Sequence, residues 1–193
     1  VDFSHLDGAW FDPARRESRR GRTARIHDPE EATPPLSFVR AVADEVGAVG
    51  AKLAPAIDHE HLVPGTETQW VSWRGQVLEA CMYFGPLARR VGEGGLAVPS
   101  GATVGPAGAL AEGAVIARSA LVLGSDGRPA QLVPDSTDEA ELRNPPVGSI
   151  GAYLWEPDGA VIRAGLLGTL ARKLGAHTID GSIAYLSSDD ASQ

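Results

Sequence analysis

The hydrophobic pattern at the start of the chain predicts two short strands. Ala9, Trp10 and Phe11 run directly into Asp12-Pro13, which is typical of a buried strand that ends in a polar turn, because proline cannot extend the ladder. Residues 48–54 are small and apolar and are stopped by Pro55, so they form the second predicted strand.

A helix is predicted between these two strands. Apolar residues recur there at helical spacing, at Leu36, Val39, Val42 and Val46. Thr33 is placed to cap the helix, Pro34 and Pro35 fall in its first turn, and Gly47 ends it.

The order strand, helix, strand predicts a parallel pair with a right-handed crossover. Asp12 and residues 52–58 would then lie at the same carboxyl edge of the sheet, where open α/β sheets bind ligands. Asp12, Lys52 and Asp58 are therefore candidate site residues, and Lys52 could pair with Asp12 or with a substrate phosphate. The structural alternatives are that Asp12-Pro13 only begins a loop and that Lys52 only closes a salt bridge.

A hairpin is predicted farther along. Residues 67–73 and 76–84 are strand-like and are separated by Arg74-Gly75. Aromatic residues on these strands could stack on nucleic-acid bases, but aromatics on strands more often form cross-strand core pairs, and we favour the core for this set: Trp70, Trp73, Tyr83 and Phe84.

The second half of the chain is more ambiguous. Residues 96–104 are compatible with one extended segment, and residues 114–123 with either a strand or a helix. From Gly124 to Pro146 the composition is polar and acidic with four prolines, which predicts an exposed linker and a domain boundary.

Beyond this boundary the pattern predicts a strand over residues 149–155 and a short final strand over 183–186. A long helix is predicted between them, with Ile162, Leu166, Leu170 and Leu174 at intervals of four and Gly175 as its end. Arg163 would lie in the first turn, where the helix dipole disfavours a cation, so we expect a specific partner: Glu156, Asp158 or an external phosphate.

Composition restricts the class of protein. The chain has 193 residues and a balance of apolar and charged residues typical of a globular protein. It contains neither a long uncharged apolar window nor the pattern of a secretory signal, so a cytoplasmic location without membrane contact is expected. The single cysteine, Cys81, lies in an apolar run and is interpreted as a buried structural thiol.

Charge is distributed unevenly. The net charge of −8 argues against non-specific nucleic-acid binding by the chain as a whole. Directly after Asp12-Pro13, however, stand six of the seventeen basic residues: Arg15, Arg16, Arg19, Arg20, Arg22 and Arg25. Such a loop could hold the phosphates of RNA, and the alternative is a solvated charge run. The Asp58-His59-Glu60-His61 stretch supplies too few convergent ligands for a metal, so no metal site is predicted.

Several separated motifs in the same order resemble one known family. They are Asp12-Pro13-Ala14-Arg15-Arg16, Asp28-Pro29, Pro34-Pro35-Leu36-Ser37, residues 52–58, residues 153–165 and Ile183-Ala184-Tyr185-Leu186. The chain resembles the back half of bacterial class I S-adenosylmethionine-dependent methyltransferases that carry a C-terminal THUMP-like domain.

The resemblance implies an α/β fold: the C-terminal half of a Rossmann-like methyltransferase sheet, with parallel strands and a terminal antiparallel hairpin, followed by a small α+β region. It divides the chain into a methyltransferase part over 1–105, a connecting segment over 106–147 and the beginning of a THUMP-like domain over 148–193. The Gly-rich cofactor turn of such enzymes is missing, and Gly92-Glu93-Gly94-Gly95 does not replace it. A fragment without activity of its own is therefore expected.

The resemblance also implies S-adenosylmethionine as cofactor and an RNA substrate. Asp12, Pro13 and Arg15 would lie at the transfer site, and substrate contacts would come from Arg16, Arg19, Arg20, Arg22, Lys52, Asp58 and Arg163. Ala14-Arg15 replaces the second proline and the aromatic of the related base-binding motif, which puts methylation of a base amino group in question. Two alternatives stay open: a non-catalytic RNA-binding or scaffolding protein, and a methyltransferase for a small anionic metabolite.

Overall fold

The structure of the protein is a computed structural model. It describes residues 2–3, 5–14, 16–19, 22–25, 28–91, 113–125 and 127–190, and for 16–19 and 22–25 it describes the backbone alone. Residues 92–95 and the extended segment expected over 96–104 lie outside the described residues.

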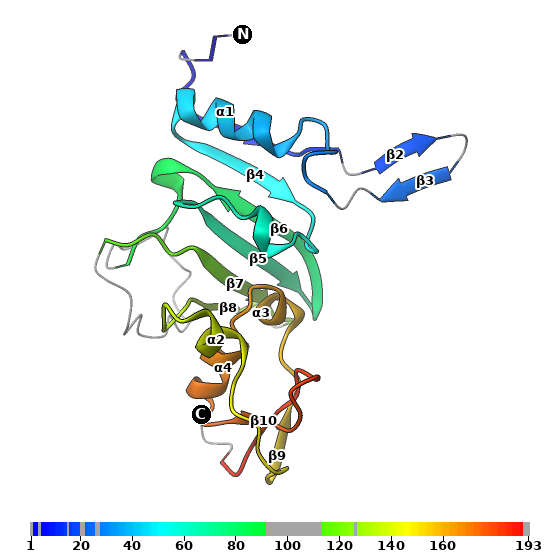
Figure 1. Cartoon of the computed structure of the whole chain (residues 1–193), viewed down its shortest axis with the longest axis vertical. Coiled ribbons are helices and arrows are strands. Elements are labelled where there is room, and N and C mark those ends of the chain that lie inside the picture. Colours follow the sequence, from blue (N-terminus) through cyan, green and yellow to red (C-terminus); the bar gives the residue numbers. More distant parts are fainter. Residues whose placement is uncertain are drawn as a thin grey trace.

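A six-stranded mixed sheet forms the centre of the fold (Figure 1). Its strands, in spatial order, are β1 (Ala9–Phe11), β4 (Val49–Leu53), β6 (Gln76–Tyr83), β5 (Glu67–Trp73), β7 (Arg118–Leu123) and β8 (Pro129–Leu132). The β1–β4 and β5–β7 pairs are parallel and the other pairs are antiparallel. The predicted parallel pair and the predicted hairpin are both confirmed, and positive φ angles at Arg74 and Gly75 make the tight hairpin turn.

Helix α1 (Leu36–Val46) connects β1 to β4 and covers one face of the sheet. Its Phe38 ring contacts Phe11 of β1 edge to face, with 6.2 Å between the ring centroids. The helix ends at Gly47 as predicted, but the predicted cap is wrong. Pro35 occupies the N-cap position without a side-chain hydrogen bond, because Thr33 pairs through its backbone with Ala14 instead.

The basic segment after β1 forms a two-stranded antiparallel ribbon rather than an open loop. Its strands are β2 (Arg16–Arg19) and β3 (Arg22–Arg25). The ribbon extends away from the body of the molecule beside β4 and α1 (Figure 1).

The expectation of an exposed linker over 124–146 is wrong. β8 extends the sheet, and α2 (Glu139–Arg143) follows it with Leu142 buried in the core. The prolines misled the prediction because Pro129 is the first residue of a strand at the sheet edge, one of the few strand positions that tolerate proline.

The long helix expected after residue 159 is broken into α3 (Gly159–Arg163) and α4 (Leu167–Lys173). Gly165 has a φ of 67°, which no continuing helix can accommodate, and Leu166 is fully buried at the break. Arg163 therefore lies in the last turn of α3, where the dipole favours a cation, and not in the first turn.

A smaller antiparallel sheet completes the C-terminal part. It has the order β10 (His177–Thr178), β11 (Leu186–Ser188) and β9 (Tyr153–Trp155). Two 3-10 turns, η1 (His59–His61) and η2 (Gly85–Leu87), lie in the loops of the main sheet. Buried side chains of α2, α3 and the main sheet share one hydrophobic core, while the division of the chain at residues 105 and 147 stays a prediction.

Candidate functional site

The carboxyl ends of β1 and β4 bring two predicted site residues together. Lys52 Nζ donates to Asp12 Oδ2 at 2.6 Å, and the Asp12 side chain is still 54% exposed. Pro13, the next residue in the chain, is buried. The predicted proximity of Asp12 and Lys52 is confirmed, and their role in binding or transfer stays a prediction.

Trp10 lies on the same side of the sheet. Its indole rests against the backbone of Gly50, where any Cβ would overlap the ring, and its ring centroid is 6.3 Å from that of Tyr83. The side chain is 55% exposed. Sequence reasoning did not select Trp10, although a residue two positions before Asp12 on a strand shares its face.

The basic ribbon begins four residues after Asp12. Its register places Arg16 opposite Arg25 and Arg19 opposite Arg22. Like charges directly opposite each other destabilise a strand pair. The binding of a substrate by these arginines stays a prediction. Arg15 and Arg20 lie outside the described residues.

The other two candidates lie elsewhere. Asp58 is exposed at the N-terminus of η1, and its side chain makes no capping hydrogen bond. Arg163 Nη1 donates to the Pro55 carbonyl at 3.3 Å, whereas Asp158 caps α3 through the Ala160 N–H. The partners expected for Arg163 are thus replaced by a backbone carbonyl of the loop after β4, and its contact with substrate stays a prediction.

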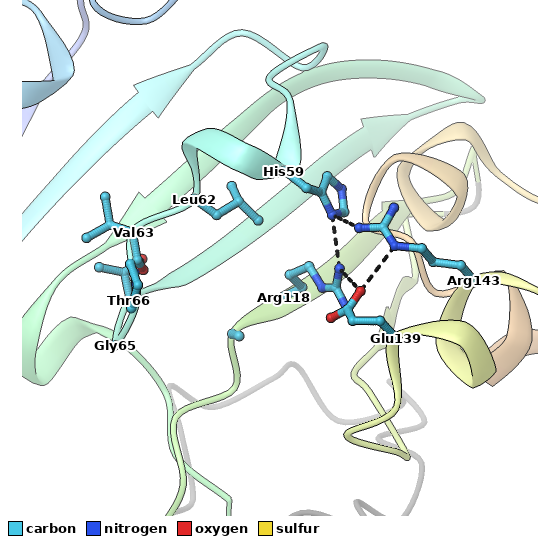
Figure 2. A pocket seen from close by; sticks show the side chains of 10 residues that line it. His59, Leu62, Val63, Gly65, Thr66, Arg118, Glu139 and Arg143 are labelled. Atoms are coloured by element: carbon cyan, nitrogen blue, oxygen red, sulfur yellow. Dashed lines mark hydrogen bonds and ion pairs between the residues drawn. The ribbon is translucent and has the colours of Figure 1, made fainter.

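A second polar cluster surrounds His59 in a pocket of about 290 Å³ (Figure 2). His59 Nε2 donates to the Arg163 carbonyl at 2.6 Å, so Nδ1 is left as an acceptor. Guanidinium groups donate to Nδ1 from Arg118, at 2.9 Å, and from Arg143, at 2.5 Å. Burial lowers the pKa of His59 and the two guanidinium groups lower it further, although the hydrogen bond to the Arg163 carbonyl opposes them.

Glu139 completes this cluster. Its carboxylate accepts from Arg118 at 2.7 Å and from Arg143 at 3.1 Å. Burial raises its pKa, but the two guanidinium groups outweigh burial and hold the pKa below its usual range. Both nitrogens of the His59 ring are engaged, and no group of three or more metal-binding side chains occurs among the residues that the structure describes.

The aromatic set behaves mainly as core. Trp70 and Phe84 are buried, and the Trp70 Nε1–H donates to the Pro55 carbonyl at 3.1 Å. Trp73 differs, because it is 48% exposed with the Arg74 guanidinium 4.7 Å above its ring. Cys81 is buried as predicted, and burial raises the pKa of its thiol to about 12.

Comparisons with known proteins agree with this architecture. No protein-family model matches the chain. The chain is 32% identical over 182 residues, 93% of its length, to uncharacterized S-adenosylmethionine-dependent methyltransferases of Mycobacterium tuberculosis strains CDC 1551 / Oshkosh and H37Rv. It spans 40% of the length of these relatives.

A solved structure shares the fold. A crystal structure from Porphyromonas gingivalis W83, named as that of a "putative methyltransferase", superposes with a TM-score of 0.60 and 19% sequence identity. The match covers 97% of this chain and 41% of that one. The α/β fold class, with its parallel strands and antiparallel hairpin, is therefore shown. Among the described residues, none of the helices combines the length and apolar character that a membrane span requires.

Proposed function

We propose that this chain is part of an S-adenosylmethionine-dependent methyltransferase that acts on RNA in the cytoplasm of a bacterium. The observation that carries the proposal is the Asp12–Lys52 pair at the carboxyl edge of β1 and β4, on a fold shared with the P. gingivalis structure. Similarity to the M. tuberculosis methyltransferases along 93% of the chain supports the same reaction class.

S-Adenosylmethionine would supply an electrophilic methyl group on a sulfonium. The residues present fit one side of its site: Asp12 offers an exposed carboxylate and Pro13 a rigid wall at the strand end. The Gly-rich turn that would hold the rest of the cofactor is missing from the sequence. We infer that a further segment of a longer protein supplies it, in accord with relatives of which this chain spans 40%.

Asp12 has a defined task in this proposal. Its carboxylate accepts hydrogen bonds only, so it would orient an N–H group of the substrate for attack on the methyl carbon. Lys52 binds Oδ2 at 2.6 Å and so fixes the direction of the carboxylate.

The RNA substrate is supported by the arginine ribbon. β2 and β3, which begin four residues after Asp12 in the sequence, place four arginines in two opposed pairs, in a chain whose net charge is −8. A concentration of positive charge at one point of an acidic protein suits a polyanion held through its phosphates. The C-terminal sheet, with α3 and α4, would then be the beginning of a THUMP-like domain that adds RNA contacts.

Isothermal titration of S-adenosylmethionine into this chain and into the full-length protein tests the proposal. We expect binding to the full-length protein alone, because this chain carries one side of the site. ATP is the control ligand, since it shares the adenosine but lacks the sulfonium. Tight binding to the chain alone would contradict the divided site, and no binding to either protein would favour the non-catalytic RNA-binding alternative.

A further inference from the structure

The indole of Trp10 forms a flat, open surface on the sheet. Gly50 has no side chain, so the ring lies directly on the β4 backbone, and Tyr83 supports it from β6 in the same register row. The ring is held from beneath yet 55% exposed. An indole fixed in this way loses little freedom when a second ring stacks on it.

The same face carries the Asp12–Lys52 pair. Gly50 and Lys52 are two residues apart on β4, so they point to one side of the sheet, and Trp10 lies over Gly50 while Asp12 binds Lys52. Phe11 points to the opposite side, where it contacts Phe38 of α1. The stacking surface and the charged pair are therefore neighbours on the face of the sheet opposite α1.

We propose that Trp10 is the stacking platform for an unpaired base of the RNA substrate. This inference rests on the proposed function and specifies how that site reads its substrate. A base offers an aromatic face to the indole and polar edge atoms to the carboxylate or ammonium beside it. The arginine ribbon begins four residues beyond Asp12, so a strand whose phosphates it holds brings its bases to this surface.

The test measures binding of two probes to the full-length protein by fluorescence anisotropy. One probe is a single-stranded RNA of mixed sequence, about 12 nucleotides long, and the other is an abasic oligomer with the same phosphates. Trp10→Ala should weaken RNA binding by about 5- to 150-fold, the usual contribution of one stacked base, and leave abasic binding unchanged. Trp10→Phe keeps a ring and should retain most of the affinity.

Trp73→Ala is the matched control, because Trp73 is also exposed, at 48%, but lies at the hairpin turn. If Trp10→Ala weakened binding of the RNA and of the abasic oligomer equally, or weakened neither, the stacking role of Trp10 would be contradicted. If Trp10→Ala lowered the affinity for S-adenosylmethionine and left RNA binding unchanged, the stacking role would also be contradicted, because the ring would then face the cofactor. If the wild-type protein bound neither probe, the proposed RNA substrate itself would be contradicted. This outcome differs from those that contradict only the stacking of a base on Trp10.

Discussion

His59 connects more parts of the molecule than the other residues of its pocket. It lies in η1, stacks on Trp70 of β5 with 5.2 Å between ring centroids, and accepts from Arg118 of β7 and Arg143 of α2. Its Nε2–H binds the carbonyl of Arg163 at the end of α3. The imidazole therefore links the main sheet to the C-terminal helices through hydrogen bonds. It fits this position only when neutral.

The environment of His59 predicts that the stability of the folded chain depends on pH. Since the pKa of His59 is lowered in the folded chain, the unfolded chain binds more protons below about pH 6.5, so the free energy of unfolding falls as the pH falls. One proton limits the slope to about 1.4 kcal/mol per pH unit, and partial exposure makes it smaller. Glu139, whose pKa is also lowered, loses its stabilising charge at lower pH.

Urea unfolding at several pH values between about 5.5 and 7.5 measures this dependence. His59→Gln should flatten the slope, because an amide accepts and donates like the neutral ring without titrating. His61→Gln is the matched control from the same 3-10 turn and should leave the slope as in the wild type. Identical slopes in all three proteins would contradict the assignment.

The sequence predicts that Asp12 and Lys52 lie together, but it does not predict the polar cluster around His59. Asp12 and Lys52 follow two strands whose parallel order is visible in the hydrophobic pattern. The partners of His59 are separated from it by 59, 84 and 104 residues. They meet because β7 pairs with β5 and because α2 and α3 pack onto the main sheet. No metal site is predicted at the Asp58-to-His61 stretch, and its His59 accepts and donates hydrogen bonds between the main sheet and the helices.

At the scale of elements, the β2–β3 ribbon carries the proposed phosphate contacts. Arg22→Ala should lower the slope of log affinity against log salt by about 0.7, the value for one lost contact with a single strand. RNA affinity itself should fall severalfold. Salt-dependent fluorescence anisotropy on the full-length protein measures both quantities.

Arg40→Ala supplies the matched control, because Arg40 is exposed on α1 and its loss changes the net charge equally. Equal slopes for Arg22→Ala, Arg40→Ala and the wild type would show that the ribbon does not contact phosphates. A weak salt dependence in the wild type would favour a small anionic metabolite over RNA.

Elements with a regular pattern and clear ends were predictable, and elements defined by packing were not. The parallel strands, α1 and the hairpin follow from alternation, helical spacing and turn residues. β8 was missed because an edge strand tolerates polar residues and a leading proline. The α3–α4 break was missed because the i, i+4 stripe continues through Gly165, whose positive φ turns the chain and buries Leu166.

At the scale of the whole molecule, the two ends of the main sheet differ. Its β1–β4 end carries Asp12, Lys52 and the exposed indole of Trp10, and the arginine ribbon extends from the same end (Figure 1). Its β7–β8 end is packed against α2 and α3 and shares their core. The chemistry that we propose is thus concentrated at one edge of the sheet, while the opposite edge serves as the attachment of the C-terminal region.

The most direct test is methyl transfer from labelled S-adenosylmethionine to RNA by the full-length protein and its Asp12→Ala variant. Asp44→Ala, an exposed carboxylate on α1, is the control. We predict that Asp12→Ala lowers the rate by about 100-fold or more, because it removes the group that orients the substrate, and that Asp44→Ala leaves the rate unchanged. An Asp12→Ala variant as active as the wild type would contradict the placement of the transfer site at the end of β1.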